Sequence, residues 1–409
     1  MSYVSKDWSD RYAHRASEMK ESEVRALFAV VNRVNEDGTP QVVSLAGGMP
    51  YVQALSTDVI SEVQSRLLKE KGGIALQYGS GQGTLVLREQ ITEIMGLEGI
   101  NANAENIVIT TGSQSALDLL SKIFLDRGNV VLVESPTYVG ALGVFKSYQA
   151  DVEHVYTDSM GMSPEHLENK ILHLQKLGKR IKFIYIVPNF SNPTGYVLPL
   201  ERRKAIVEIA KKYDILIVED DPYGLLYFDG VTPPPALINL GEEENIAYLG
   251  SFSKTFAPGF RVGWCLAPES IRKHLVLANE AAVLSPSEFS QLTISEYLKH
   301  TDWNSQLNTF RDLYQQRRDV MIGSLDKYLP NLNKTITKGG FFTWLDLPEH
   351  IDSKELLLKA VEHGVAYTPG TAFYADGRGK TQLRLSFSYP ADEYIEKGVK
   401  LLSEVINNE

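Results

Sequence analysis

The sequence predicts an α/β fold in which helices cover a largely parallel β-sheet, followed by a second, smaller α+β region. Short β-branched and aliphatic runs alternate with helical patterns over about the first two thirds of the chain, which is typical of a doubly wound sheet. These runs are almost continuously apolar, as expected where helices cover both faces of a sheet. The length of 409 residues exceeds what one ordinary core organises, so we expect two packed regions.

The predicted strands follow one another through the first part of the chain. Runs with the composition of buried strands occupy residues 106–111, 129–134, 182–187, 215–220, 245–250 and 263–267. Helical patterns follow the first two strands at 113–124 and 137–148, and an amphipathic pattern at 199–213 precedes the fourth. The alternation predicts parallel strands joined by helical crossovers.

A different pattern begins near residue 270. Long helices are predicted within residues 275–325, and a last helix at 391–406. Short strands are predicted between them, at 339–347, 364–370 and 381–388. The sequence therefore predicts a second α+β domain at this end of the chain.

The N-terminal region contains one further helical pattern, at residues 17–33. Its apolar positions need a surface to cover them, and the second domain is the surface we expect. We therefore expect residues 1–45 to form an arm packed on the small domain, 46–290 to form the large, cofactor-binding domain, and 291–409 to form the small domain.

Composition and charge narrow the class of protein. The formal net charge is −10 and no basic tail is visible, which argues against nucleic acid or an anionic membrane as the main partner. The single cysteine, Cys265, allows no internal disulfide, and the polar N-terminus lacks the apolar core of a signal peptide. No run approaches the length of a membrane span, so we expect a cytoplasmic protein. No histidine or cysteine spacing predicts a metal site.

The polar residues that follow the predicted strands are the candidates for chemistry. Ligands of parallel α/β sheets bind at the carboxyl ends of the strands. The segments that should line this edge lie far apart in the sequence, at residues 112–114, 136–138, 189–195, 220–223 and 251–254. We expect them to form one rim.

Several of these residues favour an anionic guest. Ser113 and Gln114 open a helix, where free N–H groups and the helix dipole attract a phosphate. Ser251 and Ser253 add hydroxyl donors, and Arg261 adds a fixed positive charge. A serine at a helix start is usually only an N-cap, so the prediction of a phosphate depends on the whole set.

Lys254 lies among small residues in SFSKTFAPGFRVGW, directly after an apolar strand. A surface lysine is the commoner fate, but an amine in this setting can also attack a carbonyl and form a Schiff base. A phosphate-bearing aldehyde held by a lysine points to pyridoxal phosphate, which needs an acid at its pyridine nitrogen. Asp220 suits that position, and Tyr223 or Asn192 could reach the ring hydroxyl. Taken singly, Asp220 is better explained as part of a turn at the end of a strand, and Asn192 as part of a β-turn. The prediction of a cofactor site depends on their combination.

Together these motifs carry a family resemblance. The segments SFSKTFAPGFRVGW, NPTG, EDDPY, GSQSALD and RLSF resemble the fold-type I, class I aminotransferases in order and spacing. The N-terminal EVRALF followed by SLAGGMP is similar to the branch of 2-aminoadipate, kynurenine and broad-specificity aminotransferases. The resemblance covers nearly the whole chain. It implies a mostly parallel seven-stranded sheet, bound pyridoxal 5'-phosphate, a homodimer and ping-pong transfer of an amino group between an amino acid and a 2-oxo acid.

The resemblance also implies roles for individual residues. Lys254 would hold the cofactor and move the proton, Asp220 would keep the pyridine nitrogen protonated, and Tyr223 and Asn192 would hold the ring oxygen. Tyr138 would stack on the ring, although an ordinary core tyrosine is the alternative. The phosphate would be held by Ser113, Gln114, Ser251, Ser253 and Arg261.

Four more residues complete the expected site. Arg384, in an otherwise apolar strand, would grip the substrate α-carboxylate, and even without the family such an arginine calls for an anionic partner. The resemblance implies that Tyr78 reaches the active site of the neighbouring subunit and that the backbone at Gly48 lets substrate approach. Arg25 matches a residue that can meet a distal carboxylate, or it is a plain helix-surface arginine.

Two other functions stay open at this point. A C–S lyase or another lyase of the same fold would share the lysine, the aspartate and the asparagine. A ligand-sensing regulator would carry a DNA-binding domain before the aminotransferase-like part, and the residues before SLAGG are not basic enough for one. Within the aminotransferases, 2-aminoadipate, aromatic and branched-chain donors with 2-oxoglutarate as acceptor all remain possible.

Overall fold

The computed structural model describes residues 7–17, 41–241 and 245–409. The predicted N-terminal helix at 17–33 and Arg25 therefore lie outside the described residues. The described part of the N-terminus contains a 3-10 turn at Ser9–Arg11 and one short α-helix, α1 (His14–Ser17). No helix in the described part of the chain is long and apolar enough to cross a membrane.

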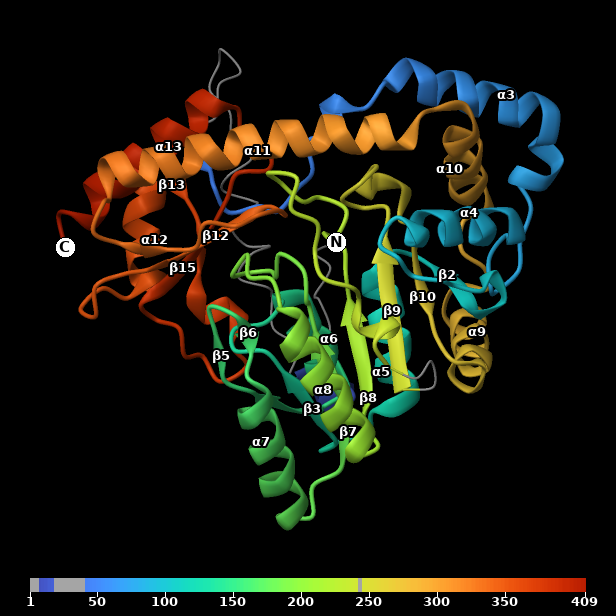
Figure 1. The fold of residues 1–409 in the computed structure, drawn as a ribbon, viewed down its shortest axis with the longest axis horizontal. Coiled ribbons are helices and arrows are strands. Elements are labelled where there is room, and N and C mark those ends of the chain that lie inside the picture. The colour runs from blue at the N-terminus through green and yellow to red at the C-terminus, as the bar shows by residue number, and fades with distance from the viewer. Residues whose placement is uncertain (1–6, 18–40, 242–244) are drawn as a thin grey trace.

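A seven-stranded sheet forms the centre of the molecule (Figure 1). Its strands, in spatial order, are β2 (Ile107–Thr110), β10 (Gly263–Leu266), β9 (Ile246–Ser251), β8 (Leu216–Asp220), β7 (Ile181–Ile186), β3 (Val130–Val133) and β4 (Asp151–His154). Strand β10 is antiparallel to both of its neighbours, and the other pairs are parallel. The predicted α/β fold with a mostly parallel sheet is confirmed.

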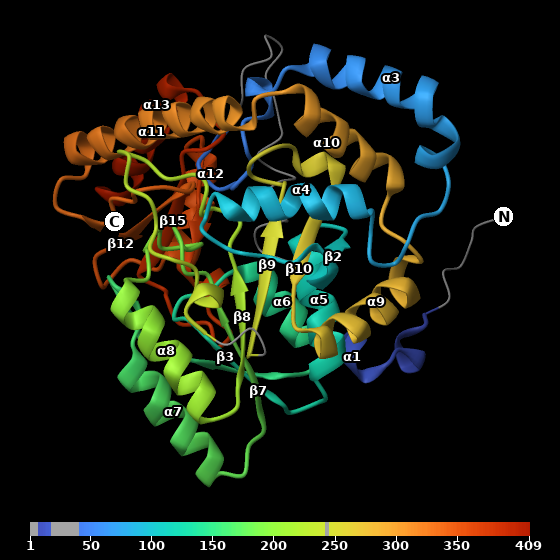
Figure 2. The same cartoon turned by 45° about the vertical axis from the view of Figure 1, so that its right-hand side comes forward.

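Helices cover both faces of this sheet, as the apolar strands require. Alternate strand residues point to opposite faces, so Tyr185 and Val218 belong to one apolar cluster and Ile184 and Ile217 to the other. The first face is covered by α5 (Ser113–Phe124), α6 (Val139–Ser147) and α9 (Glu269–Val283). The second is covered by α4 (Leu85–Gly96), α7 (Pro164–Lys176) and α8 (Leu200–Lys212), and Figure 2 shows α7 and α8 side by side.

A smaller antiparallel sheet lies in the C-terminal part of the chain. Its order is β11 (Asn333–Lys334), β12 (Phe342–Asp346), β15 (Gln382–Ser386) and β14 (Thr368–Pro369). The helices beside it are α11 (Trp303–Tyr328), α12 (Ser353–Glu362) and α13 (Asp392–Ile406). The domain boundaries given above remain predictions.

The remaining strands and helices include a pair that joins the start of the described chain after residue 40 to the C-terminal region. Strand β1 (Val43–Ser44) pairs in parallel with β13 (Val365–Ala366), so the chain near residue 43 lies against the C-terminal part. Helices α3 (Thr57–Ala75) and α10 (Glu288–His300) pack on each other, and β5 (Thr157–Asp158) pairs with β6 (Gly161–Met162).

Two hydrogen bonds also join the large sheet to the segment that follows β14. The backbone N–H of Thr137 donates to the carbonyl oxygen of Phe373 at 3.0 Å, and the N–H of Ala375 donates to Nε2 of His154 at 2.9 Å. These contacts bring the C-terminal region against the carboxyl ends of the large sheet, where the site lies.

Candidate active site

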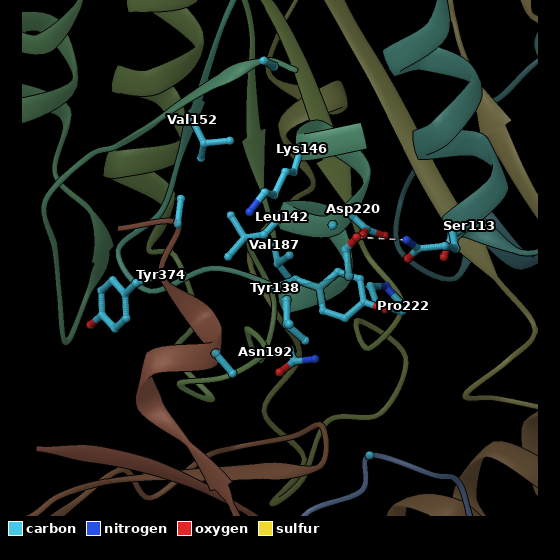
Figure 3. Close-up of a pocket in the computed structure, with 18 of the residues that line it drawn as sticks. Ser113, Tyr138, Leu142, Lys146, Val152, Val187, Asn192, Asp220, Pro222 and Tyr374 are labelled. Atoms are coloured by element: carbon cyan, nitrogen blue, oxygen red, sulfur yellow. Dashed lines mark hydrogen bonds between the residues drawn. The ribbon is translucent and has the colours of Figure 1, made fainter. Parts of the chain in front are cut away.

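A cleft of about 1290 Å³ opens at the carboxyl ends of the central strands. Figure 3 shows Ser113, Tyr138, Asn192 and Asp220 around it. Its walls contain nearly all the residues that the sequence predicted, namely Gly48, Ser113, Gln114, Tyr138, Asn192, Asp220, Tyr223, Ser251, Ser253, Lys254, Arg261 and Arg384. The fold therefore brings residues from both sheets to one place.

Lys254 follows strand β9 and projects into the cleft wall. Its Nζ donates a hydrogen bond to the carbonyl oxygen of Gly48 at 2.9 Å. Burial, followed by the positive charges of Arg384 and Arg261, lowers the pKa of Lys254 to about 8. A neutral amine is therefore accessible near physiological pH, and such an amine can act as a nucleophile and as a base.

Asp220 is the last residue of strand β8, and its carboxylate is buried. Its Oδ2 accepts a hydrogen bond from the hydroxyl of Tyr185 at 2.7 Å, whereas its Oδ1 has no partner. Burial raises the pKa of Asp220 to about 7. A buried carboxylate oxygen without a partner is costly, so this atom calls for a donor in the cleft, such as a protonated ring nitrogen.

The start of helix α5 forms a seat for an anion. No side chain caps this helix, and its first two residues, Ser113 and Gln114, line the cleft, so the first N–H groups are available to an anion there. Gly112 has a φ of +79° and comes so close to the Arg261 guanidinium that a Cβ atom there would clash with it. The Nη1 of Arg261 also lies 3.4 Å from the hydroxyl of Ser253. Free N–H groups beside a guanidinium suit a phosphate.

The side chains of Ser251 and Gln114, also at this seat, each make a hydrogen bond within the protein. Ser251 Oγ accepts a hydrogen bond from the backbone N–H of Ser253 at 3.0 Å, which leaves its own proton free to donate. Gln114 Nε2 donates to the carbonyl oxygen of Gly140 at 3.0 Å. Gln114 would therefore meet an anion with its backbone N–H at the start of α5.

Arg384 reaches the cleft from strand β15 of the small sheet and is buried. Its Nη1 donates to Asn192 Oδ1 at 2.7 Å, and its Nη2 donates to Thr368 Oγ1 at 3.2 Å, while its Nε has no partner. The guanidinium lies over the ring of Phe342, 4.1 Å from its centroid. Burial lowers the pKa of Arg384 to about 10, so it stays charged at neutral pH.

Two tyrosines line the cleft between Asp220 and Arg384. Burial and the charge of Asp220 raise the pKa of Tyr138 to about 12. Burial raises the pKa of Tyr223 as well, and a hydrogen bond with Asn192 opposes that shift. Both phenols are therefore hydrogen-bond donors throughout the physiological range.

Two predicted site residues are not brought into this cleft. Tyr78 is 76% exposed in the loop between α3 and α4, and it does not line the cleft. Arg25 falls in the part of the chain that the structure leaves undescribed. Within residues 7–17, 41–241 and 245–409, no group of three or more His, Cys, Asp or Glu residues could hold a metal ion.

The structure also adds residues that sequence reasoning missed. Tyr185, within the predicted strand 182–187, donates to Asp220, and Phe342 stacks on Arg384. The phenol of Tyr185 is the only side-chain polar group in the inner part of a strand that is otherwise apolar there, a signal that could have marked it.

A partly neutral lysine, an unpaired acid and an anion seat around one cleft define a pyridoxal-phosphate enzyme of fold type I. The family model "Aminotransferase class I and II" matches residues 40–402. The chain belongs to this family, and it is a pyridoxal-phosphate-dependent aminotransferase.

Individual relatives agree with this assignment. An aromatic-amino-acid aminotransferase of Thermococcus litoralis is 39% identical over 98% of this chain and 95% of its own length. A 2-aminoadipate transaminase of Thermus thermophilus is 35% identical over 98% of this chain and 97% of its own. The crystal structure of a Pyrococcus horikoshii kynurenine aminotransferase with PMP superposes with a TM-score of 0.92 at 37% identity, over 98% of both chains.

Proposed function

We propose that this aminotransferase takes the amino group of an aromatic L-amino acid and passes it to a 2-oxo acid, with 2-oxoglutarate as acceptor. The observation that carries the proposal is Arg384, a buried cation that lines the same cleft as Lys254 and whose Nε has no partner. Amino donor and 2-oxo acceptor share an α-carboxylate, so one arginine can bind both in turn. A shared site is what ping-pong transfer requires.

The residues of the cleft divide the work. The cofactor, when bound, supplies the aldehyde that takes up the amino group and the ring that stabilises the negative charge left at Cα. Lys254 holds the cofactor and then carries a proton away from the substrate Cα and back, for which a pKa of about 8 is well matched. The free Oδ1 of Asp220 would accept a hydrogen bond from the protonated ring nitrogen. Tyr223 and Asn192 bind the ring oxygen.

The remaining cofactor contacts are assigned in the same way. Tyr138 covers one face of the ring. The phosphate is bound by the start of α5, with Ser113 and Gln114, and by Ser251, Ser253 and Arg261. A Cβ at position 48 would meet the Phe342 ring, which accounts for the glycine there. We assign the backbone of Gly48 to the close approach of the substrate. Arg25, if it acts, meets a distal carboxylate of the substrate.

The aromatic donor is supported by the wall of the cleft. Tyr138, Phe342 and Tyr374 line it and provide flat apolar surface for an aromatic side chain. Two similar proteins, the aromatic-amino-acid aminotransferase and the kynurenine aminotransferase, are named for aromatic donors. Because another similar protein is a 2-aminoadipate transaminase, 2-aminoadipate is the main alternative to an aromatic donor.

A half-reaction screen tests the donor. The loaded enzyme is mixed with single amino acids and no 2-oxo acid, and the visible absorbance of the cofactor is followed. We expect phenylalanine, tyrosine, tryptophan and kynurenine to react at least ~10-fold more efficiently than 2-aminoadipate, leucine or aspartate, because burying an aromatic ring stabilises the complex. Greater efficiency for 2-aminoadipate would contradict the aromatic assignment. Catalytic release of ammonia in place of a single half-turnover would indicate a lyase.

We also propose that the enzyme is a homodimer in which Tyr78 completes the partner's phosphate site, and that it acts in the cytoplasm. The hydroxyl-bearing side chain of Tyr78 is exposed and lies away from its own cleft. Leu68, Ile74 and Leu76 on the same stretch of chain are also exposed, as expected of a surface that another subunit covers.

Mixed dimers provide the test of Tyr78. Tyr78→Ala and Lys254→Ala subunits are each expected to be impaired, but a mixed dimer holds one intact site, made of Lys254 from one subunit and Tyr78 from the other. Equal mixing and reassembly should restore about a quarter of the wild-type activity. In the control, the Tyr78→Ala enzyme alone is taken through the same mixing and reassembly. If Tyr78 acted within its own subunit, mixing would restore nothing.

A further inference from the structure

Tyr185 has a structural relation to the site that packing does not explain. It lies on β7, is fully buried, and packs edge-on against Phe145 of α6 with ring centroids 5.5 Å apart. A phenylalanine would fill the same volume, so the hydroxyl must be accounted for separately. That hydroxyl donates to Asp220 Oδ2 at 2.7 Å. A buried phenol needs such a partner, and here the partner is the acid of the cleft.

The geometry around Asp220 makes this hydrogen bond decisive. Among the described residues, Tyr185 is the one side chain that donates a hydrogen bond to this carboxylate. It binds Oδ2 and leaves Oδ1 without a partner in the wall of the cleft. Because the Tyr185 ring is held by the packing of Phe145, the direction of the carboxylate is set before any ligand binds.

Tyr185 is unsuited to act as an acid or a base. Burial and the nearby charge of Asp220 raise its pKa well above the ordinary value, so the phenol stays protonated and can only donate. Its hydrogen bond is also the largest influence opposing the effect of burial on the pKa of Asp220. Without this donor, the pKa of Asp220 would rise further and the carboxyl group would be neutral at a higher pH.

We propose that Tyr185 is a positioning residue whose hydroxyl fixes the Asp220 carboxylate, so that Oδ1 faces the ring nitrogen of the cofactor and the group stays charged. The inference rests on the role proposed above for Asp220. The titratable groups that interact electrostatically with the Asp220 carboxylate are Tyr138, Tyr185, Tyr223, Asp221 and Lys254.

The test compares Tyr185→Phe with Tyr248→Phe in the full-length loaded enzyme. Tyr248 is a close match, since it is also buried, lies on β9, the other neighbour of β8, and donates to a carboxylate, that of Glu98, at 3.1 Å. Its side chain belongs to the apolar cluster on the opposite face of the sheet from Tyr185 and does not line the cleft. Both changes remove one hydroxyl and keep the ring.

The readout is the ¹⁵N chemical shift of ring-labelled cofactor, which reports protonation of the ring nitrogen directly. Tyr185→Phe should move this shift toward the unprotonated value, weaken cofactor binding about 10-fold and lower kcat about 10-fold with little change in KM. Tyr248→Phe should match the wild type in all of these. A Tyr185→Phe enzyme with wild-type shift and cofactor affinity would overturn the proposal.

Two further variants separate the possible failures. 3-Fluorotyrosine at position 185 is a stronger donor and should move the ¹⁵N shift in the opposite direction, which keeps the test available if Tyr185→Phe does not fold. Asp220→Asn should abolish protonation of the ring nitrogen. If Asp220→Asn behaves as wild type, the proposed role of Asp220 fails; if it loses protonation while Tyr185→Phe does not, only the inference about Tyr185 fails.

Discussion

Replacing Lys254 by alanine is expected to lower kcat by at least ~10⁴-fold and to remove the visible absorbance of the covalently held cofactor. The physical reason is that one amine has two tasks. Its nitrogen lies in the cleft and donates a hydrogen bond to the carbonyl oxygen of Gly48. Its pKa of about 8 allows it both to lose and to regain a proton near neutrality.

The measurement is steady-state turnover together with an absorbance spectrum of the purified enzyme. Lys146→Ala is the control, because Lys146 also lines the cleft, on α6, and the substitution removes the same side chain. Added small primary amines should restore part of the proton transfer in the Lys254→Ala enzyme, without restoring covalent attachment to the chain. Retention of wild-type turnover in Lys254→Ala would exclude the assignment.

Replacing Arg384 by alanine is expected to reduce kcat/KM at least ~30-fold for the amino donor and for the 2-oxo acceptor alike, equivalent to about 2 kcal/mol or more. Both substrates carry the α-carboxylate that Arg384 is proposed to bind. The arginine is buried over Phe342 and its Nε has no partner, so its loss would leave the substrate carboxylate without its buried cation.

Two variants sharpen this test. Arg127→Ala removes a positive charge from another part of the same cleft and should leave both substrates nearly unaffected. Arg384→Lys keeps the charge but loses the planar fork, so it should recover only part of the loss. If Arg384→Ala impaired the donor and spared the acceptor, a carboxylate common to both could not be its ligand.

The sequence predicted the central strands well because buried parallel strands leave a strong signal. The run at 215–220 is apolar over its first four residues and ends in Glu219 and Asp220, and the structure has β8 at Leu216–Asp220. Strand β4 was missed, because its residues, Asp151–His154, are mostly polar and only partly buried at the edge of the sheet. An edge strand lacks the two covered faces that make a strand recognisable. Helices α3 and α4 were also not assigned.

The chemistry of the site was also readable in advance, since its residues follow strands whose carboxyl ends must meet. Lys254 and Asp220 come from adjacent strands, β9 and β8, and both line the cleft. Their contacts were not readable. Nothing in the sequence relates Arg384 to Asn192, which lie 192 positions apart, or places Phe342 beneath the guanidinium.

The sequence by itself determined the fold class, the cofactor and the chain positions of the reactive groups, because these depend on periodicity and on residue type at strand ends. The tertiary structure decided which oxygen of Asp220 is free, that Tyr185 binds the other, and how burial moves the pKa of Lys254 and Asp220 toward each other. Such properties arise from distances and desolvation between segments far apart in the chain, and these exist only once the chain has folded.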